Sequence, residues 1–250
     1  MIPLANYPLH RPELYEPLQR GARKLFELMS ARQVMFRAGT CIVEAGLPHD
    51  RVWRLRTGWC IHTRALADGR QLISQVFLPG DFLMVDCLLL AKQPENLESL
   101  TEATLNWMDR CALQRVVAAN HEVALRLMWQ LVEDQRRLRQ LSALLGRSSA
   151  EARIAAMLLD FQARLRQPGI LSRDSFRLPM TQQQIADYLG LSVVHVNRVL
   201  MRLRAMHVAI VRRTSVVILN RAELARLALP VDAGAEQDWA GQADAGTERP

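Results

Sequence analysis

The six residues at 193–198, Val-Val-His-Val-Asn-Arg, carry side chains suited to contacts with nucleic-acid edges. Arg198 can donate two hydrogen bonds to guanine O6 and N7, or it can bind a phosphate. Asn197 can pair with adenine or bind a phosphate. Val193 and Val194 have no hydrogen-bonding side-chain groups, but they can pack on thymine methyl groups.

Residues around this run add groups that suit phosphates. His195 leaves two interpretations open, a direct base contact or a structural role in the first turn of a helix. Gln182 and Gln183 would stand at the start of a preceding helix, whose free N–H groups also favour phosphates. Arginines after the run would add sequence-independent attraction. The candidate interface consists of Thr181, Gln182, Gln183, Ser192, Val193, Val194, His195, Asn197, Arg198, Arg202, Arg212 and Arg213.

Two helices joined by a tight turn must position these side chains. Thr181 can cap the first helix, and Gln184 three residues later completes a capping box. Gly190 can adopt the left-handed conformation that the turn requires, and Ser192 can cap the second helix. The apolar spacing is typical of a helix-turn-helix, whose second helix enters the major groove of DNA. An ordinary helical hairpin is the alternative.

The charge of the chain is concentrated around this unit. The net charge of the whole chain is +7, and residues 146–230 hold 13 Arg against 5 Asp and Glu, a net of +8. The last 20 residues carry 5 acids and one Arg, so the basic region is followed by an acidic tail that we expect to be disordered. A basic domain of this kind indicates an anionic partner, with double-stranded DNA as the first candidate.

The first half of the chain has a sequence pattern typical of β-strands. From Phe36 to about Leu113, short β-type runs alternate with Gly-centred turns, and Asp68-Gly69 is the strongest hairpin signal. This pattern predicts an antiparallel roll or barrel. Residues 14–34 predict one or two short helices before it. Two short strands around residues 212–215 follow the helix-turn-helix and predict a wing.

A helical pattern begins at about Asn120, a plausible N-cap, and contains a leucine-rich heptad repeat. Asp134 interrupts the repeat, and the surrounding polar residues leave only a narrow apolar stripe. We favour a two-stranded homodimer helix, with a core helix packed on its own domain as the alternative. The predicted dimer seam consists of Ala124, Leu127, Leu131, Leu138, Leu141 and Leu145.

The order of these parts resembles the family of the cyclic AMP receptor protein and the fumarate–nitrate reduction regulator, the Crp/Fnr family. The resemblance rests on Leu-Pro-Gly-Asp-Phe at 78–82, the heptad helix, the helix-turn-helix at 180–200 and the wing. It implies an α+β chain with a cupin-like antiparallel β-roll, a long dimerisation helix and a C-terminal winged helix-turn-helix. The implied domains are a 1–20 extension, a 21–119 cyclic-nucleotide-binding-like sensor roll, a 120–146 dimerisation helix, a 147–229 DNA-binding domain and a 230–250 tail.

The resemblance further implies a bacterial transcription factor that binds a palindromic operator as a homodimer, with RNA polymerase as a further partner. The sequence departs from the family at two places. Val194 stands where many members have a Glu that accepts a hydrogen bond from cytosine. The Gly-Glu-Leu motif and the later Arg-Ser or Arg-Thr pair of cyclic-nucleotide binders are both missing. A cyclic nucleotide would therefore bury an unpaired anion, and we do not expect it to bind.

Other cofactors and functions find little support in the sequence. No Cys precedes Cys41 and no Cys-x-x-Cys pair occurs, which argues against an iron–sulfur cluster or structural zinc. A haem sensor using His62 or Cys60, or a sensor of an unknown small effector, is the alternative within the family. No His-x-His occurs, so we expect no cupin-type metalloenzyme and no catalytic residues. No membrane span or signal peptide is predicted, so we expect a cytoplasmic protein.

Overall fold

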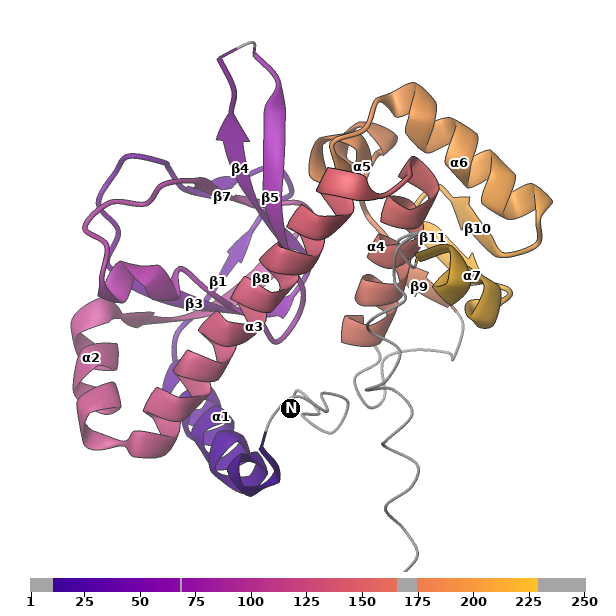
Figure 1. The fold of residues 1–250 in the computed structure, drawn as a ribbon. Helices are drawn as coiled ribbons and strands as arrows, with labels where there is room; N and C mark the ends of the chain where they lie inside the picture. The colour runs from indigo at the N-terminus through magenta and orange to yellow at the C-terminus, as the bar shows by residue number, and fades with distance from the viewer. Residues whose placement is uncertain (1–10, 68, 166–174, 229–250) are drawn as a thin grey trace, which may run out of the picture.

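The computed structural model describes residues 11–67, 69–165 and 175–228, which form a β-roll, a long central helix and a C-terminal helical domain (Figure 1). The predicted 230–250 tail and the first half of the 1–20 extension lie outside the described residues. A 3-10 turn at Pro12–Leu14 leads into α1, Tyr15–Ser30. The α+β class predicted from the sequence is confirmed.

The roll consists of two four-stranded antiparallel sheets. One has the order β1-β8-β3-β6 and the other β2-β7-β4-β5. The pairing of β4 with β5 confirms the predicted hairpin, and Gly69 has a φ of 80° in its turn, while Asp68 lies outside the described residues. The strands are β1 Gln33–Phe36, β2 Cys41–Val43, β3 Arg51–Thr57, β4 Cys60–Ala65, β5 Gln71–Phe77, β6 Phe82–Leu83, β7 Asn96–Ser99 and β8 Ala103–Asp109.

Two helices follow the roll. The sequence places the start of helical structure at about residue 120, but α2, Arg110–Ala119, already begins directly after β8. Asp109, a residue type that favours the N-cap, stands directly before α2, although its side chain makes no capping hydrogen bond there. The long helix α3, His121–Arg147, does begin as predicted, because the Asn120 side chain accepts a hydrogen bond from the Val123 amide at 3.0 Å.

The face of α3 that is free for a partner differs from the predicted seam. Leu127 is only 4% exposed and packs in the core under the roll, and Leu141 packs against the core shared with the C-terminal domain. Asp134, between them on the same stripe, accepts a hydrogen bond from Gln75 of β5 at 3.1 Å. Leu127 is therefore buried within its own chain and is not available to a partner, contrary to the prediction, whereas Leu141 is half-buried and its place in the seam stays a prediction. The large exposed apolar side chains of α3 are Met128, Leu131, Val132, Leu138 and Leu145.

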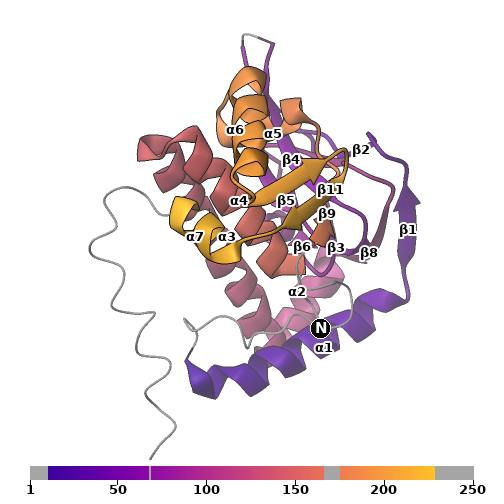
Figure 2. The ribbon, with the colours of Figure 1, turned by 90° about the vertical axis from the view of Figure 1, so that its right-hand side faces the viewer.

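The C-terminal domain combines helices with a small antiparallel sheet of order β10-β11-β9. Its core also includes residues of the roll, and the rings of Trp59 and Phe161 meet edge to face with centroids 5.3 Å apart. Figure 1 shows α3 running between the roll and this domain, and Figure 2 shows α1 crossing beneath them. The elements are α4 Ala150–Leu165, β9 Ser175–Arg177, α5 Gln182–Leu189, α6 Val193–Ala205, β10 Ala209–Arg212, β11 Ser215–Ile218 and α7 Arg221–Ala228.

A buried ion pair also joins the roll to the C-terminal domain. Asp81, between β5 and β6, receives a hydrogen bond from Arg164 of α4 at 2.6 Å and one from the Leu78 amide at 2.8 Å. Arg164 also donates to the Val76 carbonyl at 2.9 Å. Both charged side chains are almost completely buried, so the roll and α4 are held in one arrangement.

The contact between α1 and α3 depends on Gly21. A Cβ at this position would lie 2.1 Å from the Glu122 carbonyl oxygen, which is backbone and cannot move aside cheaply. We expect Gly21→Ala to lower the free energy of unfolding by ~1–3 kcal/mol through overpacking. Gly146→Ala is the matched control, since a Cβ there meets nothing within 4 Å. Equilibrium urea denaturation measures both, and equal stability of the two variants would contradict the close approach at Gly21.

Candidate nucleic-acid interface

The predicted caps of the two helices are present. The Thr181 hydroxyl accepts from the Gln184 amide at 3.2 Å, and the Gln184 side chain accepts from the Thr181 amide at 2.9 Å. Gly190 has a φ of 61°, the left-handed region that favours glycine. Ser192 accepts from the His195 amide at 3.2 Å and starts α6. The local sequence therefore sets both helices and the turn between them.

One face of α6 is anchored in the core and the other is open. Val196, Val199 and Leu203 are buried against the domain. The opposite side exposes two large apolar side chains, since Val194 is 66% exposed and Met201 is 68% exposed. Exposing large apolar side chains to water is unfavourable. An apolar patch on the outer face of α6 therefore suggests a surface that contacts a partner.

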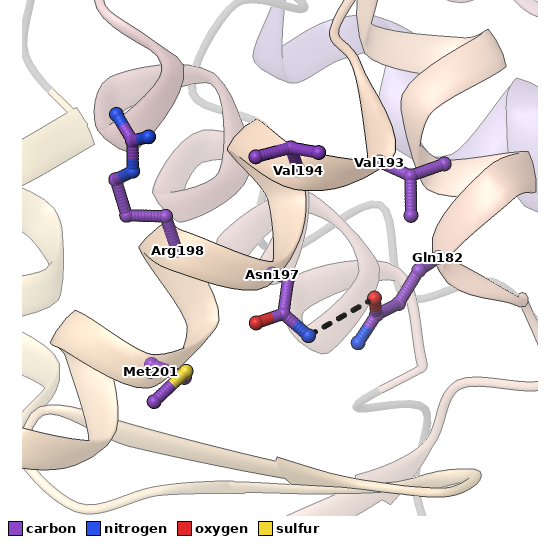
Figure 3. Close-up of a pocket in the computed structure, with 6 residues that line it drawn as sticks. All are labelled: Gln182, Val193, Val194, Asn197, Arg198 and Met201. Carbon is purple, nitrogen blue, oxygen red and sulfur yellow. Dashed lines mark hydrogen bonds between the residues drawn. The ribbon is translucent and has the colours of Figure 1, made fainter.

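A shallow groove lies along this open face (Figure 3). The Asn197 amide donates to the Gln182 side-chain oxygen at 3.3 Å, which links α6 to the start of α5. Figure 3 shows Arg198 extending from α6 away from that pair, and among the described residues it has no hydrogen-bond or ion-pair partner. The groove is lined by Gln182, Val193, Val194, Asn197, Arg198 and Met201.

Three predicted polar residues have partners inside the protein. The His195 ring nitrogen Nδ1 lies 3.0 Å from the Ser192 hydroxyl, as the capping interpretation expects. Gln183 donates to Asp187 at 2.7 Å. Arg202 forms an ion pair with Glu151 of α4 at 3.1 Å, although its side chain is still 65% exposed. These contacts orient the side chains and must be exchanged or shared when a phosphate is bound.

Val193 differs from its neighbour. It is half-buried and packs against the core of the domain, so only part of its side chain is available to a partner. Arg212 and Arg213 are exposed at the turn between β10 and β11, which pair as the predicted wing, and β10 contacts α6. The wing arginines therefore extend the positive surface beyond α6.

Met201 is a residue that the sequence interpretation missed. It lies seven residues after Val194, which is close to two full turns of an α-helix, so both side chains share one face. The same spacing rule that predicts the buried residues of α6 also predicts this exposed stripe.

The interior of the roll holds the two residues considered as haem ligands. His62 is half-buried, with Nε2 3.3 Å from the Met84 sulfur and Nδ1 3.7 Å from a Glu95 oxygen. Burial lowers the pKa of His62 to about 4, although the Glu95 carboxylate acts in the opposite direction. Burial raises the pKa of Cys60 to about 12, so its thiol stays protonated at neutral pH. Both side chains are therefore neutral and packed inside the roll.

Within residues 11–67, 69–165 and 175–228, no group of three or more His, Cys, Asp or Glu side chains is arranged to hold a metal ion. Among the helices of those same ranges, none combines the length and the apolar character needed to cross a bilayer.

Comparison with known proteins agrees with the geometry. Residues 152–227 match the Crp-like helix-turn-helix domain. The chain is 29% identical to the nitrogen fixation regulation protein FixK of Rhizobium meliloti, covering 76% of this chain and 84% of that protein. It is 26% identical to the fumarate and nitrate reduction regulatory protein of Vibrio cholerae, covering 79% of this chain and 78% of that protein.

Solved structures show the same fold. The structure of FixK2 from Bradyrhizobium japonicum matches with a TM-score of 0.72 and 26% identity, covering 79% of this chain and 96% of that one. A CRP-family transcriptional regulator from Thermus thermophilus matches with a TM-score of 0.64 and 25% identity, covering 78% and 96%. Together with the capped helix-turn-helix and its open face, these matches identify the chain as a DNA-binding transcriptional regulator that carries a Crp-like helix-turn-helix domain and is similar to Crp/Fnr-type regulators over most of its length.

Proposed function

We propose that the chain acts in the cytoplasm as a homodimer on a two-fold symmetric DNA site, and that it regulates transcription without catalysing a reaction. The observation that supports this best is the exposed face of α6, where Arg198 has no protein partner among the described residues and Val194 faces solvent. A helix with this face fits the major groove, with its N-terminal residues at the base edges.

The exposed face of α3 supports a dimer. Met128, Leu131, Val132, Leu138 and Leu145 form an apolar stripe along the side of α3 that the roll does not cover. Such a stripe on an isolated helix is costly in water, and a second copy of α3 would bury it in a two-stranded coiled coil. Two copies of α6 would then face the two halves of a palindromic site.

The half-site should differ from that of family members with Glu at the position of Val194. A valine cannot accept a hydrogen bond from cytosine. Its contact with a thymine methyl group buries apolar surface and so stabilises the complex with DNA. Met201 and the exposed part of Val193 extend the same apolar strip along the groove. We therefore propose that thymine methyl groups replace a cytosine contact in the preferred half-site.

The roll is proposed to sense a small effector other than a cyclic nucleotide. Met84 and Glu95 follow the Gly-Asp-Phe turn, in the segment where cyclic-nucleotide binders have their Gly-Glu-Leu motif and Arg. Glu95 accepts a hydrogen bond from Ser74 at 2.7 Å and lies 3.7 Å from Arg64, so this segment presents an acidic side chain already paired within the protein, not an arginine for a cyclic phosphate. The DNA-bound dimer would change transcription by acting on RNA polymerase.

Replacing Arg198 by Ala tests the reading face. If Arg198 contacts a base, we expect a loss of ~1–3 kcal/mol in binding to a site selected from random DNA, and a smaller loss on unrelated DNA. Fluorescence anisotropy over a range of salt concentrations measures both. Arg115→Ala removes the same charge from an exposed position on α2 and should leave both affinities unchanged. Equal losses on the two DNAs would assign Arg198 to a phosphate instead.

Replacing single thymines of the selected half-site by deoxyuridine tests the apolar reading. Deoxyuridine lacks only the methyl group, so the loss at the contacted position should be about threefold to fivefold, given ~0.8 kcal/mol per buried carbon. Val194→Ala should bind normal DNA more weakly and should show little further loss with deoxyuridine. If no thymine position responds, or if Val194→Ala keeps the full deoxyuridine penalty, Val194 does not read a methyl group.

Charged substitutions on α3 test the dimer. Leu131→Asp together with Leu138→Asp places two carboxylates in the proposed seam, and we expect the protein to sediment as a monomer in analytical ultracentrifugation. Gln140→Asp, at an exposed position of the same helix outside the apolar stripe, should leave the dimer intact. A persistent dimer in the first variant would show that the copies associate through another surface.

A further inference from the structure

One guanidinium group connects three segments at the end of α3. Arg153, near the start of α4, donates to the Leu145 carbonyl at 2.9 Å and to the Ser148 carbonyl at 3.1 Å. Through Nη1 it also donates to the Leu189 carbonyl at 3.1 Å and to the Gly190 carbonyl at 3.4 Å. The first two acceptors belong to the end of α3 and the joint with α4, and the other two belong to the turn between α5 and α6.

These acceptors are the groups that most need a donor. Carbonyls in the last turn of a helix have no partner within the helix, and the negative end of the helix dipole lies there. Arg153 meets this need for α3 and α5 at once, because its planar group carries five donors in a fixed arrangement. The segments are also in close contact, since a Cβ on Gly190 would lie 3.3 Å from Leu145 Cδ2.

The contact made by Arg153 joins the proposed dimer helix to the turn that orients the DNA-binding helix. The end of α3 carries Leu145 of the proposed dimer seam, and the α5–α6 turn sets the direction of α6. A small rotation at Arg153 would therefore swing both copies of α6 relative to the two-fold axis. In a bound dimer, α6 and its symmetry mate must reach half-sites one helical turn apart, ~34 Å.

We propose that Arg153 is a positioning residue that fixes the half-site separation accepted by the dimer. This inference rests on the proposed homodimer function and concerns a side chain whose guanidinium donates to four carbonyls of its own chain. Arg153 acts through the carbonyls it holds, so its loss should affect where α6 is placed more than what α6 reads. The chemistry of the base contacts, at Arg198 and Val194, is unchanged.

The test uses the full chain and a set of DNA duplexes. Each duplex carries two copies of the selected half-site, with the distance between them shortened or lengthened by one and two base pairs; a further duplex carries one half-site. Wild type should prefer one spacing by at least tenfold. Arg153→Ala should bind that duplex more weakly and should discriminate among the spacings by less than about threefold, while its affinity for the single half-site stays within twofold of wild type.

A conservative variant separates geometry from charge. Arg153→Lys keeps the positive charge but cannot make four directed hydrogen bonds to carbonyls in different segments. It should lose spacing discrimination nearly as far as Arg153→Ala does. Arg115→Ala removes one positive charge, as Arg153→Ala does, and should keep the wild-type spacing profile.

Three other results would contradict either the positioning role of Arg153 or the proposed dimeric recognition. If both Arg153 variants keep the wild-type spacing profile, the positioning role is wrong, although the proposed function stands. If both lose affinity for the single half-site, Arg153 is required for the fold of the reading unit itself and the inference is also overturned. If wild type binds all spacings equally, the proposed dimeric recognition of a palindrome fails.

Discussion

The buried ion pair between Asp81 and Arg164 determines how the two halves of the molecule sit together. Burial by itself would raise the pKa of Asp81, but Arg164 and Arg137 outweigh it and hold that pKa below its usual range. Burial by itself would lower the pKa of Arg164, but Asp81 and Asp160 outweigh it and hold Arg164 in its charged form. Removing one partner of such a pair leaves a buried, uncompensated charge, at a cost of ~3–5 kcal/mol. The relative placement of roll and DNA-binding domain is thus strongly constrained.

Aromatic contacts near this ion pair fix the orientation of the roll relative to the C-terminal domain. Trp59 of the roll meets Phe161 of α4 edge to face, and Phe161 in turn stacks on Tyr188 of α5 with centroids 6.1 Å apart. The aromatic contacts continue from the roll through α4 into the helix-turn-helix. An ion pair alone fixes a distance, whereas the packed rings beside it also fix an orientation. The helix-turn-helix is therefore held by contacts with the roll as well as by its own domain.

Features set by neighbouring residues could be predicted from the sequence, and those set by distant residues could not. The capping box of Thr181 and Gln184, the left-handed Gly190 and the Ser192 cap involve contacts within four residues, and all are present. The choice between the two leucine stripes of α3 depends on which stripe the roll covers, so heptad spacing alone assigned Leu127 to the wrong side. The hydrogen bond from Arg153 to Leu189 joins residues 36 positions apart, and no local pattern indicates it.

The two arginines of α4 give this helix a defined mechanical role. Arg153 and Arg164 are eleven residues apart, which is close to three full turns, so they project from the same side of the helix, ~16 Å apart along its axis. One end is fixed to the joint of α3 and the turn before α6, and the other is fixed to Asp81 of the roll. A displacement of the roll must therefore either break a buried ion pair or move α4 with it. Because Arg153 of α4 also binds the turn before α6, a displacement of α4 would act directly on that turn.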